Sequence, residues 1–209
     1  MLETGLIAFT TFFATIGPVD VAALFAALTA RNKAAERRRI AAKGTAIGGA
    51  LLLVFAVFGE PVLGLFGISL AALRTAGGIL LLLIGIDMVF ARDSGGTGAT
   101  AAETSEAQAK EDISVFPIAT PLIAGPGAIG AVILLMAEAA GDPVATGAVI
   151  GALIAVLALT FVMMLIAVQV QKVLGVTGVH VISRVFGILL AALAVQFIFD
   201  GVRQSGLLS

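Results

Sequence analysis

Two Gly-Pro pairs stand inside long apolar stretches, and they are the residues of this sequence best suited to binding a solute. Gly17-Pro18 lies within residues 5–30, and Gly125-Pro126-Gly127 lies within residues 114–139. Proline lacks a backbone donor and clashes with the carbonyl group four residues earlier, so a helix opens there. A helix that restarts after the proline has unpaired N–H groups at the positive end of its dipole, which can hold a carboxylate.

Polar residues close to each break extend this predicted binding site. Asp20 follows Pro18 by two residues, and Thr120 precedes Gly125 by five. A carboxylate inside an apolar span is costly unless it is paired, neutralised or open to water. Two interpretations of Asp20 stay open: it binds substrate or carries a coupling proton or monovalent cation, or it only caps the restarted helix. The hydroxyls of Thr10, Thr11, Thr15 and Thr120 could line a polar path or bond their own helix backbone.

Four further polar residues are candidates for coupling or gating: Asp87, Arg74, Arg184 and Gln196. Each also has a plainer interpretation. Asp87 could pair with Arg92 or Lys110, and the two arginines could anchor lipid headgroups. Gln196 could join two helices through hydrogen bonds.

The composition indicates which solvent surrounds these residues. Apolar residues make up 60% of the 209-residue chain and charged residues only 12%, against about 45–50% and about 25% in soluble domains. We therefore expect an all-α membrane protein. Crossing the bilayer core takes about 20 apolar residues, and six stretches qualify: 5–30, 42–60, 65–91, 114–139, 145–171 and 180–203.

The distribution of basic residues predicts how the spans are oriented. Arg31 to Lys43 is expected to be a loop with six basic residues, and residues 93–112 a flexible linker rich in Gly, Ser, Thr and Ala. Placing both in the cytoplasm puts ten of the twelve basic residues inside, as the positive-inside rule requires. Both termini are then outside. The alternative, a patch for anionic lipid or nucleic acid, is weaker, and we expect no nucleic-acid partner.

The two halves of the chain resemble each other. The Gly-Pro pairs are 108 residues apart, and Arg74-x-x-Gly77 recurs 110 residues later as Arg184-x-x-Gly187. We infer a duplication, with residues 1–92 and 113–209 as three-helix repeats joined by the 93–112 linker. An odd number of spans per copy makes the repeats inverted, with helices 1 and 4 broken. Gly-x-x-x-Gly pairs at Gly44/Gly48 and Gly147/Gly151 predict close helix contacts.

Other classes of function lack their signatures. There is no Cys and a single His, so the sequence predicts neither a thiol nor a His-rich metal site, and we expect no cofactor. No nucleotide-binding loop, zinc-protease motif or Gly-x-Ser-x-Gly is present, so we expect no enzyme. The expected partners are lipids and a small solute, with self-association left open.

The stretch Pro117-Ile-Ala-Thr-Pro-Leu-Ile-Ala-Gly-Pro-Gly-Ala-Ile129 resembles a motif of the MarC family (UPF0056) of bacterial inner-membrane proteins. Ala76–Leu81 and Gly187–Gln196 also resemble that family. The resemblance implies six helices, membership of the LysE-type transporter superfamily and transport of neutral amino acids. Members usually have Asn-Pro at the first break, where this chain has Gly17-Pro18.

These observations predict a secondary transporter of small polar solutes that binds them at the midplane between the two breaks. Inverted repeats with matched discontinuous helices are a recurring transporter architecture. The alternatives are a non-transporting scaffold or assembly protein, and a channel.

Overall fold

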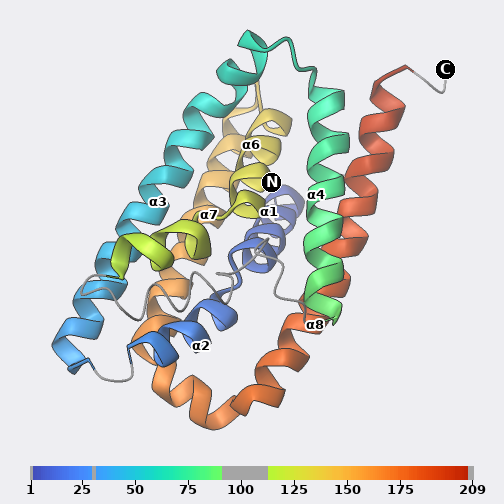
Figure 1. Ribbon diagram of the computed structural model, residues 1–209. Coiled ribbons are helices and arrows are strands. Elements are labelled where there is room, and N and C mark those ends of the chain that lie inside the picture. Colours follow the sequence, from blue (N-terminus) through green and yellow to red (C-terminus); the bar gives the residue numbers. More distant parts are fainter. Residues whose placement is uncertain (1, 30–31, 91–112, 207–209) are drawn as a thin grey trace.

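The computed structural model describes residues 2–29, 32–90 and 113–206, and over these residues it contains helices and no strand (Figure 1). The linker predicted at 93–112, with Arg92 and Lys110, lies outside the described residues. The elements in chain order are α1 (Leu2–Ile16), α2 (Pro18–Leu28), α3 (Ala34–Leu65), α4 (Leu70–Phe90), η1 (Ser114–Ile123), α6 (Pro126–Glu138), α7 (Pro143–Leu165) and α8 (Ala167–Gln204).

Five stretches of the described chain are long and apolar enough to cross a membrane: Leu2–Ala26, Ala34–Gly59, Ala71–Phe90, Pro143–Leu165 and Arg184–Gln204. A sixth is present if η1 and α6, which meet at a bend of 53°, form one span. The expectation of an all-α protein with several membrane spans is confirmed. Large apolar side chains on the outer faces fit this, since Phe58, Ile188 and Phe199 are each more than half exposed.

Helix α3, Ala34–Leu65, is longer at both ends than the span predicted at 42–60. Residues 34–43 begin α3 and do not form a loop, because alanine, glutamate and arginine are strong helix formers. The helix also continues through Pro61 to Leu65. Its stop signal is Gly67, which has a φ of 66°, and Ile68 N donates to Leu63 O at 3.0 Å. This hydrogen bond is the 6→1 bond of a Schellman motif.

The expected loop at residues 172–180 is absent. After a turn at Ile166, α8 runs as one helix from Ala167 to Gln204, and His180 lies within it. No proline interrupts this stretch, and single glycines are tolerated inside helices. In Figure 1 the first part of α8 crosses one end of the bundle before the helix runs alongside α4.

Helices α4 and α8 lie side by side through small residues (Figure 1). A Cβ on Gly85 would be 2.9 Å from Gly187 O, and a Cβ on Gly78 would be 2.7 Å from Ala194 O. Residue numbers rise along one helix as they fall along the other, so the two helices are antiparallel. The glycines let the backbones approach this closely.

The remaining helices pack against one another and against one side of this pair. Helix α1 packs on α7, and η1 packs on α3. Helix α2 packs on α8, and α6 packs on α4, while α1 and α6 also contact each other. The core between them is filled by apolar side chains with less than 2% exposure, among them Phe12, Phe25, Leu52, Leu81, Ile118, Leu134 and Leu153.

Candidate functional site

The first Gly-Pro pair separates α1 from α2. Gly17 has φ 62° and ψ 63°, in the left-handed region, which costs a non-glycine residue about 1–2 kcal/mol. Pro18 follows as the first residue of α2, where its missing N–H is not needed. Helical hydrogen bonds are present on both sides of the pair. Gly17 N donates to Phe13 O at 3.0 Å, and Val21 N donates to Gly17 O at 2.9 Å.

Asp20 lies in the first turn of α2, and its side chain points back toward the break. A Cβ on Gly17 would be 3.3 Å from Asp20 Oδ2. The N-cap residue of α2 is Gly17, which has no side chain, so Asp20 lies in the first turn and not at the N-cap position. A carboxylate in the first turn is still favoured by the helix dipole. Half-buried, it places negative charge beside the start of α2.

The second break is more irregular than the first. Within η1 the backbone is extended at Phe116 (φ −128°, ψ 124°) and at Thr120 (φ −134°, ψ 129°). A proline follows each of them, and a residue before proline is disfavoured in the helical region. The hydroxyl of Thr120 donates to Val115 O at 3.3 Å. Thr120 is therefore a half-buried residue whose backbone is not helical.

Helix α6 begins directly after this irregular segment. Gly125 is its N-cap residue, with extended backbone at φ −82° and ψ 168°, and Pro126 is its first residue. Gly125 and Gly127 are buried, whereas Pro126 is exposed. No described side chain caps α6, and its first turn has no acidic residue. The N–H groups that open this helix are therefore next to neither a capping oxygen nor a carboxylate of its own first turn.

The start of α7 shows how a helix of this chain is capped elsewhere. The Asp142 side chain accepts hydrogen bonds from Val144 N at 2.9 Å and Ala145 N at 3.2 Å. Asp142 stands at an exposed turn between α6 and α7. The two helices that begin inside apolar spans thus have glycine at the N-cap position, whereas α7, which begins at an exposed turn, has a conventional acidic cap.

The segments that flank the two breaks are in contact across the bundle. Helix α1, before the first break, packs on α6, after the second, and α2 contacts η1. Three threonines of α1, Thr10, Thr11 and Thr15, each donate to the carbonyl oxygen four residues earlier at 2.8 Å. For these three the interpretation as backbone-bonded hydroxyls is correct.

The comparisons with known proteins decide the family. The family model described as "MarC family integral membrane protein" matches residues 3–205. The chain belongs to the MarC family. The sequence motifs at 117–129 predicted this membership, and it is confirmed.

Relatives of this MarC-family chain cover nearly its whole length. It is similar to a UPF0056 membrane protein of Methanocaldococcus jannaschii, with 39% identity over 97% of each chain. It is also similar to YvbG of Bacillus subtilis, with 37% identity over 93% of this chain and 92% of the relative. For YhcE of Escherichia coli the identity is 33% over 93% and 90%. No solved structure matches.

The four residues predicted to couple or gate lie in different surroundings. Arg74 Nε is 2.8 Å from Glu138 Oε1, in an ion pair between α4 and α6. Gln196 donates to Asp200 Oδ1 at 3.1 Å on its own helix, so the expected interhelix bond of Gln196 is not seen. Arg184 is exposed, and Asp87 is half-buried.

Glu138 and Asp200 are not among the residues predicted from the sequence. Glu138 is the last residue of α6, a place where a charged residue ends many spans, so its sequence position gave no signal. Its pairing with Arg74 emerges only from the packing of α6 on α4. Metal-binding groups of three or more His, Cys, Asp or Glu residues are not found in the part of the chain that the structure describes.

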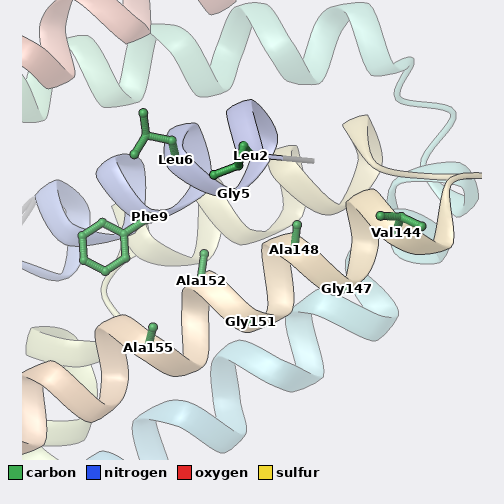
Figure 2. A pocket seen from close by; sticks show the side chains of 10 residues that line it. All are labelled: Leu2, Gly5, Leu6, Phe9, Val144, Gly147, Ala148, Gly151, Ala152 and Ala155. Carbon is green, nitrogen blue, oxygen red and sulfur yellow. The ribbon is translucent and has the colours of Figure 1, made fainter.

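A groove of about 590 Å³ runs between α1 and α7 of this MarC-family protein, and Figure 2 shows side chains of both helices along it. It is lined by Leu2, Gly5, Leu6, Phe9, Val144, Gly147, Ala148, Gly151, Ala152 and Ala155. None of these residues is charged, and none belongs to the predicted site. The groove is therefore a separate, apolar feature.

Proposed function

We propose that this MarC-family protein is a secondary transporter of small zwitterionic solutes such as amino acids, which bind between the breaks at Gly17-Pro18 and Gly125-Pro126-Gly127. The observation that carries the proposal is the pair of helices, α2 and α6, that begin inside apolar spans with a glycine as the N-cap residue, which supplies no side chain to the helix end. Such ends need polar partners in the membrane, and a solute can supply them.

The two breaks differ in charge in a way that suits a zwitterion. The first turn of α2 contains Asp20, whereas the first turn of α6 contains no acidic residue. We assign the solute carboxylate to the N–H groups that open α6, where the helix dipole is positive. The solute ammonium then lies toward Asp20. The hydroxyl of Thr120 is the next polar group on the α6 side.

The packing pattern supports two inverted repeats. If the two halves correspond, α1 is the counterpart of η1, α2 of α6, α3 of α7 and α4 of α8. The α1–α7 contact then corresponds to the η1–α3 contact, and the α2–α8 contact to the α6–α4 contact. The α4–α8 and α3–α7 contacts map onto themselves. An antiparallel α4–α8 pair is what inverted copies require. In transporters of this kind, the copies move relative to each other around a site between them.

We further propose that the protein spans the bacterial inner membrane with both termini outside. The cluster of basic residues at the start of α3 then faces the cytoplasm, as the positive-inside rule predicts. Helix α4 begins and α6 ends at the outer face. A proton or a monovalent cation, carried through Asp20, is the proposed coupling ion.

A flux experiment tests the proposal. Purified protein is reconstituted into proteoliposomes that contain an unlabelled amino acid. Counterflow of radiolabelled glycine, alanine, serine, leucine and glutamate into these vesicles is then measured. We expect exchange of small neutral amino acids. N-acetylalanine lacks the ammonium group and alanine methyl ester lacks the carboxylate, so both should compete at least tenfold less well than alanine. Absence of counterflow for the whole panel, with protein that is monodisperse after extraction, refutes the proposal.

A scaffold is the second candidate function, and the apolar groove between α1 and α7 is the observation that favours it. A scaffold requires no movement of solute, whereas a transporter requires exchange that saturates with concentration. The counterflow assay therefore separates the two. Exchange that does not saturate would instead indicate a channel.

A further inference from the structure

We infer that the Arg74–Glu138 ion pair is a gate that closes one end of the bundle by holding α6 against α4. The inference rests on the proposed transport function, because it treats α6 as an element that moves. Arg74 belongs to the first half of the chain and Glu138 to the second. The pair therefore bridges the two units that a transporter of this architecture must separate.

The ion pair lies within the interface between α4 and α6. Its side chains are mostly sheltered, with 14% exposure for Arg74 and 24% for Glu138. One turn further along each helix, a Cβ on Gly77 would be 3.4 Å from Leu134, and Leu134 is fully buried. Residues three or four apart share a helix face. The ion pair thus covers an apolar contact that leads inward toward the break.

The break gives α6 a place to pivot. Helix α6 meets η1 at a bend of 53° across Ala124-Gly125, and Glu138 is at its opposite end. Thirteen helical residues span about 20 Å, so a swing of about 10° at the break moves Glu138 by about 3 Å. That displacement is comparable to the 2.8 Å separation of the ion pair. A small rotation therefore breaks the contact.

A second carboxylate lies near the ion pair and repels Glu138. Asp200 of α8 lies close enough for its charge to act on Glu138, and Gly201 beside it packs against Thr75, the neighbour of Arg74. Arg74 is therefore the ion-pair partner of a carboxylate that a second carboxylate, from another helix, repels. Without it, Glu138 and Asp200 repel each other. Loss of Arg74 should open this end more than loss of Glu138.

The opposite end of the bundle has no equivalent pair among the described residues. Arg184, the counterpart of Arg74, is exposed. The 108-residue offset places the counterpart of Glu138 at position 30, which is an alanine. The end of α2 is instead bound within its own half, where Arg37 Nε donates to the Thr29 carbonyl oxygen at 3.0 Å. The positions of the other half that correspond to Arg74 and Glu138 therefore do not repeat this ion pair.

Cysteine labelling tests the gate directly, because the natural chain has no cysteine. Ala131→Cys places the reporter on a fully buried residue two turns before Glu138, on the same helix face. Ala140→Cys, at an exposed position of the same end, reports that the reagent has access. Each is labelled with a membrane-impermeant maleimide, added separately to the two sides of the membrane.

The reporter should label slowly in the parent protein and at least tenfold faster in Arg74→Gln, from the side that labels Ala140→Cys. Glu138→Gln should give a smaller increase, and Glu138→Asp, which keeps the charge but shortens its reach, a smaller one still. The charge swap R74E/E138R should restore slow labelling. Arg203→Gln removes an exposed charge of α8 at the same end and should leave the rate unchanged.

Two outcomes overturn the inference. One is a reporter labelling rate within twofold of the parent in every ion-pair variant that folds. The other is rapid labelling of the reporter in a charge-swap variant that folds. Labelling needs no solute, so its outcome is independent of the flux assay. Faster labelling without flux leaves the gate standing and refutes transport of the solutes assayed. Flux with unchanged labelling refutes the gate alone.

Discussion

Ile118 of η1 fills the space above Gly44 of α3 so closely that a Cβ on Gly44 would be 2.5 Å from Ile118 Cγ2. One turn further along, Ile123 occupies the space above Gly48 in the same way, 2.8 Å from a Cβ there. The corresponding Gly147 and Gly151 of α7 have no atom within 4 Å of a Cβ. They line the apolar groove (Figure 2). Two identical Gly-x-x-x-Gly patterns thus have opposite surroundings.

Alanine at these glycines should change thermal stability in opposite directions. Gly44→Ala forces a methyl group against Ile118 and the Ser114 carbonyl oxygen, and overpacking of this kind costs about 1–3 kcal/mol. Gly147→Ala meets open space and removes a helix-interior glycine, worth up to about 1 kcal/mol of stabilisation. The measurement is the unfolding midpoint in detergent, read from the monodisperse fraction after heating. Equal midpoints for the two variants would contradict the packing described.

The sequence predicted close contacts for both glycine pairs, and the prediction is right only for Gly44/Gly48. A glycine spacing shows where a helix has a flat face, but it does not say what approaches that face. Ile118 and Ile123 reach α3 because Pro117 and Pro121 disrupt η1, and neither the path of such a segment nor its side-chain directions follow from helical periodicity.

The spans themselves were predictable because the bilayer demands about 20 apolar residues in a row. Element ends were harder: α3 stops at a left-handed glycine after Leu65 and not at Pro61. The Arg74–Glu138 pair depends on how α4 and α6 are rotated against each other, which many weak contacts decide together. Single charged residues at span ends therefore gave no pairing signal.

Loss of the Asp142 carboxylate should destabilise α7. In Asp142→Ala, Val144 N and Ala145 N lose their acceptor, and removing such a cap costs about 1 kcal/mol. Asp142→Asn retains a capping oxygen and serves as the matched control, with a midpoint close to that of the parent. The unfolding midpoint of both variants is measured in one detergent. A midpoint for Asp142→Ala equal to that of Asp142→Asn would show that the cap contributes nothing.

Gly17→Ala should lower both stability and solute exchange. Its left-handed φ of 62° and the nearby Asp20 carboxylate both oppose a side chain, and the backbone strain alone costs about 1–2 kcal/mol. Gly141→Ala is the matched control, since Gly141 has a φ of 84° with nothing within 4 Å of a Cβ and lies at an exposed turn.

Both alanine variants should lose a similar amount of stability, but only Gly17→Ala should slow counterflow below the level explained by the amount of folded protein. Gly17→Asn should relieve part of the backbone strain, because asparagine tolerates the left-handed region better than alanine. Counterflow normalised to folded protein is the deciding measurement. If Gly141→Ala slows it as much as Gly17→Ala, the effect is one of general stability and not of the site.

Asp20→Asn should abolish the dependence of uptake on a proton or cation gradient and weaken binding of the solute ammonium. Asparagine keeps the size of the side chain but holds no charge and takes up no proton at physiological pH. Uptake is measured in proteoliposomes with an imposed pH gradient, an imposed sodium gradient or neither, and the apparent affinity for alanine is measured by counterflow.

Asp142→Asn, which removes a carboxylate remote from the breaks but keeps the α7 cap, should behave like the parent. Gradient-driven accumulation by Asp20→Asn equal to that of the parent would exclude Asp20 as the coupling group, while an unchanged affinity for alanine would remove it from the binding site. These two readouts are separable because accumulation reports the coupled ion and counterflow reports the solute.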